Sequence, residues 1–219
     1  MAELVDALGL GSSRVICGGS SPLTDMNIIK HTPFIFEYEN FVAPEDCDHI
    51  LNQVSKLRSF EPNIKKSKNG RDNNAYHIAQ YSNVEGNLRL FNYITAVGQS
   101  ALIQYYRDNP YSKYNIIEEW GVMYNYVYRY YDKNDHYNWH VDKSGDHVHF
   151  VVSFLLYLND DFEGGNTLFL HDRLKVKPKK GSVLMFPCGP YFLHKGTKVT
   201  SGQKHVIWNC FGQTQPASV

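Results

Sequence analysis

The feature that most constrains the fold is a series of short apolar and aromatic segments between residues 119 and 213, with no helical pattern between them. Segments such as Gly121–Tyr131 and His149–Asn159 are rich in Tyr, Val and Phe, the residue types that favour strands. Turn-forming clusters, including Asp132–Asp135 and Glu163–Gly165, separate these segments. Many short strands joined by turns predict an antiparallel sandwich or jelly roll.

The preceding segment, residues 26–118, predicts a helical layer that supports these strands within the same domain. A first helix is expected to open at Pro44, and its apolar residues recur at helical spacing: Cys47, Ile50, Leu51, Val54 and Leu57. A second helix is expected from Leu88 to Tyr105, after a capping-box pattern at Ser82–Glu85. The fold class is therefore predicted to be α+β with a mainly β core and supporting N-terminal helices.

Two segments outside this plan lack a clear structural pattern. Residues 1–25 have little periodicity and end in a Gly, Ser and Pro-rich stretch, so we expect a disordered extension. They also resemble the translation of a transfer-RNA gene, which would make the extension non-native and Met26 the true start. The basic loop at residues 65–71 is expected to be either a solvated loop or a mobile lid.

Composition narrows the possible partners and compartment. The 219 residues contain 22 Lys and Arg against 22 Asp and Glu, so we expect neither nucleic acid nor a membrane as a partner. The four cysteines form no C-x-x-C pair and are expected to be reduced thiols. With no apolar stretch of membrane-spanning length, the expected location is the cytoplasm. The oligomeric state stays open.

His140 and Asp142 form the most informative short motif. They are two residues apart, so on a regular strand both side chains would lie on one face. An imidazole and a carboxylate placed in this way can bind one metal ion. A second histidine from elsewhere would complete the 2-His-1-carboxylate triad that is typical of non-haem Fe(II) oxygenases. A histidine hydrogen-bonded to a carboxylate in a turn would give the same motif.

Several linked positions resemble the Fe(II)/2-oxoglutarate dioxygenase domain of prolyl 4-hydroxylases. His140-x-Asp142 matches the first metal-binding pair of that family, and His194, 52 residues after Asp142, matches its distal histidine. Lys204, ten residues further, matches the base that binds the distal carboxylate of 2-oxoglutarate. The motifs Gly164-Gly165-x-Thr-x-Phe and Pro178-x-x-Gly181-x-x-x-x-Phe match the turns between them.

The resemblance also implies roles for aromatic residues. Tyr130 and Tyr157 would contact the cosubstrate, and Tyr137 would lie in the active site. Trp208 shares a predicted strand face with Lys204 and is expected to form an apolar wall of the pocket. Some relatives have an arginine near the position of Phe150 at the substrate end of the pocket, and this chain does not.

The resemblance implies a double-stranded β-helix (jelly roll) at residues 119–213 that acts as a 2-oxoglutarate-dependent dioxygenase. It implies Fe(II) as the metal, 2-oxoglutarate as the cosubstrate and ascorbate as the reductant. The expected reaction is hydroxylation of an unactivated carbon, with a prolyl residue of a peptide or protein as the first substrate class, and release of succinate and CO2. A free amino acid or other small molecule is the alternative substrate. A metal-binding jelly roll without catalysis is the alternative outside enzymology.

Overall fold

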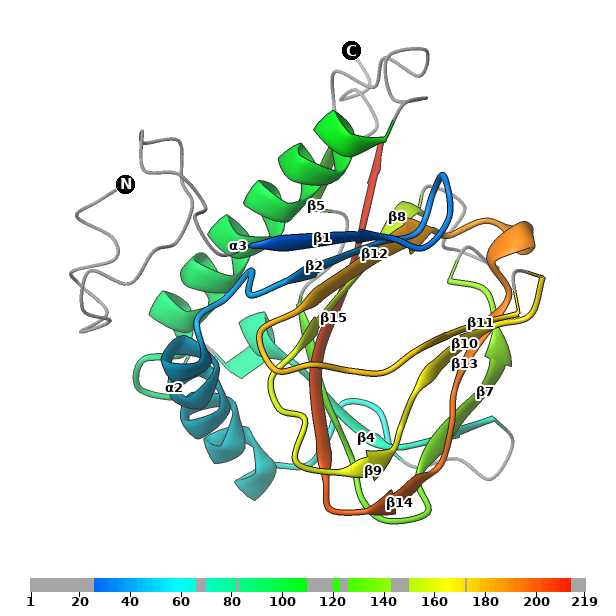
Figure 1. Cartoon of the computed structure of the whole chain (residues 1–219). Helices are drawn as coiled ribbons and strands as arrows, with labels where there is room; N and C mark the ends of the chain where they lie inside the picture. Colours follow the sequence, from blue (N-terminus) through cyan, green and yellow to red (C-terminus); the bar gives the residue numbers. More distant parts are fainter. Residues whose placement is uncertain are drawn as a thin grey trace, which may run out of the picture.

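Two antiparallel sheets with helices on one outer face make up the computed structural model of the chain (Figure 1). The structure describes residues 26–65, 70–81, 83–109, 120–122, 126–142, 150–171 and 173–213. The predicted extension at residues 1–25 and most of the basic loop at residues 65–71 lie outside these ranges. Both expectations about them therefore stay predictions.

The larger sheet runs β1-β2-β12-β8-β15-β6-β4, and β5 pairs with β15 at one end. Its strands are β1 (Asn27–Lys30), β2 (Phe36–Glu39), β4 (Asn74–His77), β5 (Trp120–Val122), β6 (Val127–Tyr131), β8 (Phe150–Tyr157), β12 (Val183–Pro187) and β15 (Lys204–Gln213). In the centre of this sheet, β8 lies antiparallel between β12 and β15.

The smaller sheet runs β11-β10-β13-β7-β3, and β14 pairs with β9 in a separate ribbon. Its strands are β3 (Arg71–Asp72), β7 (His136–His140), β10 (Thr167–Phe169), β11 (Leu174–Val176) and β13 (His194–Gly196); the ribbon is β9 (Glu163–Gly164) with β14 (Val199–Ser201). Side chains of both sheets pack together in one buried cluster that includes Tyr157, Phe169, Phe186 and Val206. The predicted jelly roll is confirmed.

The helices α2 (Pro44–Ser55) and α3 (Asn87–Asp108) lie on the outer face of the larger sheet, away from the smaller one (Figure 1). Short 3-10 turns follow or connect elements at η1 (Lys56–Ser59), η2 (Ile78–Tyr81) and η5 (Pro190–Phe192). Cys47, Ile50 and Val54 of α2 are fully buried, as the helical spacing predicted. Where α3 crosses the sheet, a Cβ at Gly98 would overlap the hydroxyl of Tyr126, so glycine permits the close approach.

One detail of residues 26–118 differs from the sequence prediction. The prediction of a capping box at Ser82–Glu85 is wrong. The helix α3 begins at Asn87, and its N-cap is Gly86 in a left-handed conformation (φ 79°) with no side-chain cap. Besides its two helices, the segment contributes β1, β2 and β4 to the larger sheet and β3 to the smaller one.

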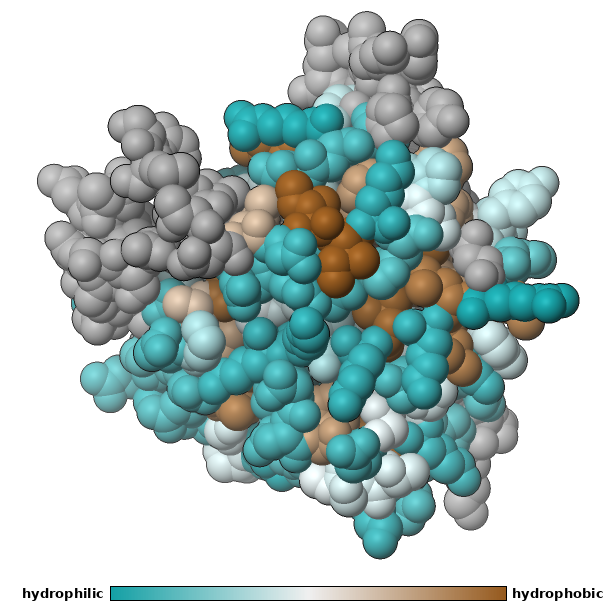
Figure 2. All heavy atoms as spheres, viewed as in Figure 1, coloured by the Kyte–Doolittle hydropathy of each residue, from teal (hydrophilic) through white to brown (hydrophobic). Residues whose placement is uncertain are grey.

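The face seen in Figure 2 is largely hydrophilic, with a small hydrophobic area over the β1 edge, where Ile28 is 41% exposed. Within the described residues, neither helix combines the length and the hydrophobicity that a bilayer crossing requires.

Candidate metal centre and its cavity

The two predicted histidine ligands lie opposite each other on neighbouring strands of the smaller sheet. His194 at the start of β13 pairs in register with His140 at the end of β7, and their ring centroids are 4.2 Å apart. The Nδ1 atom of His140 lies 2.7 Å from the carbonyl of Asn138, and that of His194 lies 2.9 Å from the carbonyl of Phe192. A carbonyl can only accept, so each Nδ1 donates and each Nε2 keeps a free lone pair.

The carboxylate of Asp142 meets both Nε2 atoms. Its Oδ1 is 3.7 Å from Nε2 of His140, and its Oδ2 is 3.8 Å from Nε2 of His194. The ligand atoms of the three residues all lie within 4.8 Å of one another, a spacing that a shared ion with bonds of roughly 2 Å can bridge. The hydroxyl of Ser153, on β8, donates a hydrogen bond to Oδ2 and orients the carboxylate.

One step of the sequence argument was wrong, although the residues converge. The strand β7 ends at His140, so Asp142 lies in a bend beyond it and does not share a strand face with His140. The carboxylate instead reaches the imidazoles because the chain turns after Val141 towards Ser153 on the other sheet.

The protonation states match what a divalent metal requires. Burial, reinforced by the neighbouring His194, lowers the pKa of His140 to about 3, so its imidazole is neutral at neutral pH. Burial alone would raise the pKa of Asp142, but the imidazoles of His194 and His140 and the Ser153 hydroxyl outweigh it and lower this pKa. Two neutral imidazoles and one carboxylate form a donor set that suits Fe(II).

A small cavity of about 40 Å³ opens between the sheets beside these ligands. It is lined by Arg129, Tyr131, Tyr137, His140, Leu155, Thr167, His194, Gly196, Lys204, Val206 and Trp208. The lining contains two basic side chains, Arg129 and Lys204, and no carboxylate. An anionic ligand such as 2-oxoglutarate therefore fits its chemistry.

Lys204 is the basic residue of this lining that the sequence analysis singled out. Lys204 is 6% exposed, and its Nζ donates a hydrogen bond to the carbonyl of Gly165 at 2.6 Å. The rings of Tyr157 and Tyr131 lie 5.2 Å and 5.6 Å from Nζ. Burial without an ionised partner lowers the pKa of Lys204 to about 7. An ammonium held in this way is suited to receive a carboxylate.

Three predicted aromatic residues lie at or under the cavity. The Tyr137 ring stacks on the His140 ring with centroids 3.6 Å apart. Trp208 lines the cavity and packs against Cys188 and Cys210. The hydroxyl of Tyr157 is hydrogen-bonded to Thr167 Oγ1 at 2.9 Å, in the buried layer beneath Lys204.

Tyr130 does not line the cavity, so its assignment as a cosubstrate contact is corrected. Its ring belongs to the core under the helices, where Arg58 lies 4.3 Å above it and Asn74 Nδ2 donates to its hydroxyl at 2.7 Å. Because side chains alternate along β6, the neighbouring Tyr131 takes the inward position. The same alternation turns Arg129 inward, a residue that the sequence analysis did not single out.

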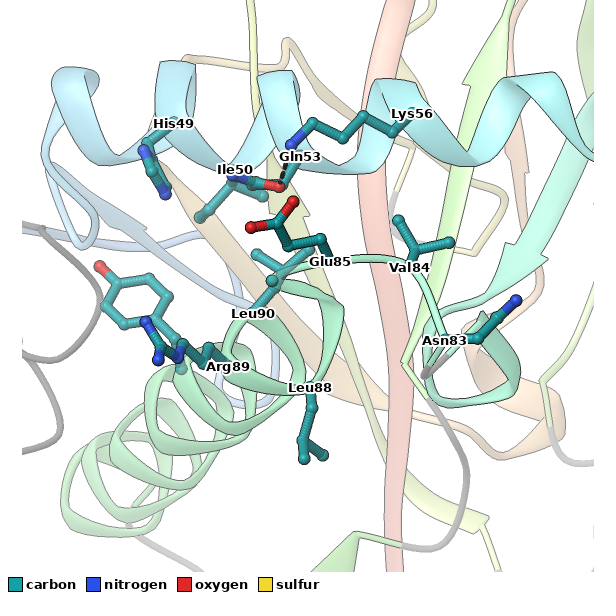
Figure 3. A pocket seen from close by; sticks show the side chains of 12 residues that line it. His49, Ile50, Gln53, Lys56, Asn83, Val84, Glu85, Leu88, Arg89 and Leu90 are labelled. Carbon is teal, nitrogen blue, oxygen red and sulfur yellow. Dashed lines mark hydrogen bonds between the residues drawn. The ribbon is translucent and has the colours of Figure 1, made fainter.

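A second and larger cavity, of about 560 Å³, lies away from the metal ligands. In Figure 3, His49 and Gln53 of α2 and Lys56 of η1 face Glu85 and the start of α3. Leu88 points away from the helix pair. None of the predicted site residues borders this cavity. The larger cavity is therefore not the one that the predicted site residues line. The converging metal ligands and the buried basic side chains favour the small cavity as the functional site.

A jelly roll that holds a 2-His-1-carboxylate cluster beside a buried base has the architecture of 2-oxoglutarate-dependent oxygenases. Residues 126–212 match the 2OG-Fe(II) oxygenase superfamily. Of the curated relatives, an Acanthamoeba polyphaga mimivirus protein assigned as a prolyl 4-hydroxylase is 26% identical over 194 residues, covering 79% of this chain and 78% of its own. Prolyl 4-hydroxylase 2 of Arabidopsis thaliana is 25% identical over 233 residues, covering 89% and 73%.

Solved structures share the fold. The viral collagen prolyl hydroxylase of Paramecium bursaria Chlorella virus-1 superposes with a TM-score of 0.62 at 19% identity, covering 83% of this chain and 97% of its own. A Trichoplax adhaerens prolyl hydroxylase superposes with a TM-score of 0.66 at 16% identity, covering 83% and 84%. The chain therefore resembles the 2OG-Fe(II) oxygenases, with prolyl 4-hydroxylases among its relatives, and this resemblance supports Fe(II) and 2-oxoglutarate as the metal and cosubstrate.

Proposed function

We propose that this protein hydroxylates a prolyl residue in a peptide or protein, converting 2-oxoglutarate and O2 to succinate and CO2, with ascorbate as the reductant. The observation that carries the proposal is the convergence of His140, Asp142 and His194 within 4.8 Å beside the buried Lys204. In this proposal the three residues bind the iron. Lys204 binds the distal carboxylate of 2-oxoglutarate, and Tyr131 replaces Tyr130 as the tyrosine beside it.

Iron and 2-oxoglutarate, when bound, supply the oxidation of an unactivated carbon, and the chain's own residues prepare the site for it. The carbonyls of Asn138 and Phe192 set the tautomers of the two histidines. Ser153 orients Asp142. The apolar wall formed by Leu155, Val206 and Trp208 excludes water from the ligands and strengthens each charged contact.

The choice of a prolyl substrate rests on the relatives. The Arabidopsis relative is named a prolyl 4-hydroxylase, and the Trichoplax enzyme is a prolyl hydroxylase in complex with a peptide fragment. A peptide is therefore the substrate class that we propose first. Free proline is the competing substrate.

The proposal is tested by incubating the purified chain with Fe(II), 2-oxoglutarate, ascorbate and a library of proline-containing peptides, with free proline in parallel. We expect succinate release coupled to the gain of one oxygen atom on a peptide, read by mass spectrometry. Activity that rises with free proline and with no peptide would replace the peptide proposal by the amino-acid alternative. Absence of succinate in every reaction of the iron-loaded protein would contradict the enzyme assignment.

A further inference from the structure

Arg129 is a buried cation in the cavity for which the reaction described above has no use. Arg129 is 5% exposed, and it shares the inward face of β6 with Tyr131. In the register with β15, Arg129 pairs with Val206, while Tyr131 pairs with Lys204. The two cations therefore enter one cavity from adjacent strands, about two residues or roughly 7 Å apart along the sheet.

The guanidinium is held in place but is not neutralised. It lies 4.9 Å from the ring of Trp208 and 5.6 Å from the ring of Tyr137, contacts that orient a planar cation. Its Nε and Nη1 atoms are buried and have no hydrogen-bond partner among the described residues. Buried charged donors without acceptors are costly, so the arrangement favours an anionic ligand that supplies them.

The charges of the loaded site indicate which ligand this is. The charges of Fe(II), the Asp142 carboxylate, the Lys204 ammonium and dianionic 2-oxoglutarate cancel. Arg129 then leaves one positive charge that no described residue of the cavity lining compensates. Because the Tyr137 ring contacts both the Arg129 guanidinium and the His140 ring, the uncompensated charge is close to the metal, where the substrate must enter.

We propose that Arg129 binds a carboxylate of the substrate, so that the preferred substrate is an acidic prolyl peptide. This inference rests on the proposed function. The carboxylate comes either from an acidic side chain next to the proline or from the C-terminus of a peptide that ends in proline. Either carboxylate can accept charge-assisted hydrogen bonds from the unpartnered guanidinium donors.

The test measures binding under nitrogen, so that no turnover is needed. Calorimetry of the Fe(II)- and 2-oxoglutarate-loaded protein compares acetyl-Ala-Glu-Pro-Ala-amide with its Gln counterpart, and acetyl-Ala-Ala-Pro with its C-terminal amide. The wild type should bind the acidic member of at least one pair about tenfold to hundredfold more tightly, the range for a charge-assisted hydrogen bond. The pair that shows the preference identifies the source of the carboxylate.

Two variants separate the role of Arg129 from a general charge effect. Arg129→Gln should remove the preference for the acidic peptide while its affinity for 2-oxoglutarate stays within about twofold of wild type. Arg129→Lys should keep part of the preference for the acidic peptide. This second variant provides the test if Arg129→Gln does not fold. Arg58→Gln is the matched control, because Arg58 is an exposed arginine that stacks on Tyr130 outside the cavity, and it should bind as the wild type does.

Three results would overturn the inference. A wild type without preference in either pair would show that no substrate carboxylate binds here. Loss of 2-oxoglutarate affinity in Arg129→Gln, with the peptide preference intact, would assign Arg129 to the cosubstrate instead. A wild type that binds iron but no 2-oxoglutarate would overturn the proposed function and the inference with it, whereas failure of the peptide arm alone leaves the proposed function standing.

Discussion

The protonation of Lys204 should control the affinity for 2-oxoglutarate. Burial lowers the pKa of Lys204 from 10.5 to about 7 in the ligand-free protein, but its pairing with a carboxylate requires the charged ammonium. Above pH 7, binding must therefore take up a proton. A lysine of this pKa is half charged at pH 7 and about 1% charged at pH 9, so the affinity should fall roughly fiftyfold over this interval.

The same shift has a defined effect on stability. The unfolded chain holds the Lys204 proton up to about pH 10.5, whereas the folded chain releases it near pH 7. Between these values the unfolded state binds more protons than the folded state. The contribution of Lys204 to the free energy of unfolding of the ligand-free protein therefore rises with pH. The gain is present in full above the unfolded pKa and is lost as the pH falls through 7. Its upper bound is on the order of 5 kcal/mol.

Lys204→Met is the matched perturbation. It leaves the carboxylate of 2-oxoglutarate buried without a partner, which costs about 3 to 5 kcal/mol, or about two to four orders of magnitude in affinity. Calorimetric titrations at pH 7, 8 and 9, in buffers of different ionisation enthalpy, should show uptake of about one proton per 2-oxoglutarate at pH 9 in the wild type and none in the variant. An affinity that is independent of pH, with no proton uptake, would refute the assignment of Lys204.

Four further substitutions test the geometry. Tyr131→Ala should weaken 2-oxoglutarate binding in calorimetry. Tyr130→Ala should lower the free energy of unfolding by about 3 to 5 kcal/mol in denaturant unfolding and leave the affinity for 2-oxoglutarate unchanged. The reverse pattern would restore Tyr130 as the cosubstrate contact. Ser153→Ala should weaken iron binding about tenfold to hundredfold in a chelator competition, and unchanged iron affinity would show that this hydroxyl does not orient Asp142. Gly98→Ala should lower the unfolding free energy by about 1 to 3 kcal/mol through overlap with Tyr126; a neutral effect would mean that α3 can shift.

The β architecture was predictable because strand composition and turn chemistry are local properties of the sequence. The Cys47, Ile50 and Val54 stripe of α2 was equally readable, since a helix repeats its buried face every three to four residues. The start of α3 was not, because Gly86 provides a left-handed N-cap that competes with the Ser82–Glu85 pattern. Backbone conformation decided that end of the helix.

The site was predictable in its residues and less so in its geometry. The spacing of His140 and Asp142 and the family resemblance at His194 selected three residues that the structure brings together. Neither could show that β7 ends before Asp142. Counting back from His140 selected Tyr130, and a one-residue error on a strand exchanges the inner and outer faces. That error also hid Arg129, because its inward position follows only once Tyr131 is known to point into the cavity.

The central claim is that an iron ion held by His140, Asp142 and His194 couples the oxidation of 2-oxoglutarate to hydroxylation. The most direct measurement is the amount of succinate and of hydroxylated peptide formed by the wild type and by Asp142→Ala, each supplied with excess Fe(II) and shown to be folded by thermal unfolding. We predict equal amounts of the two products from the wild type and neither product from the variant. Wild-type yields of succinate and hydroxylated peptide from Asp142→Ala would contradict the account.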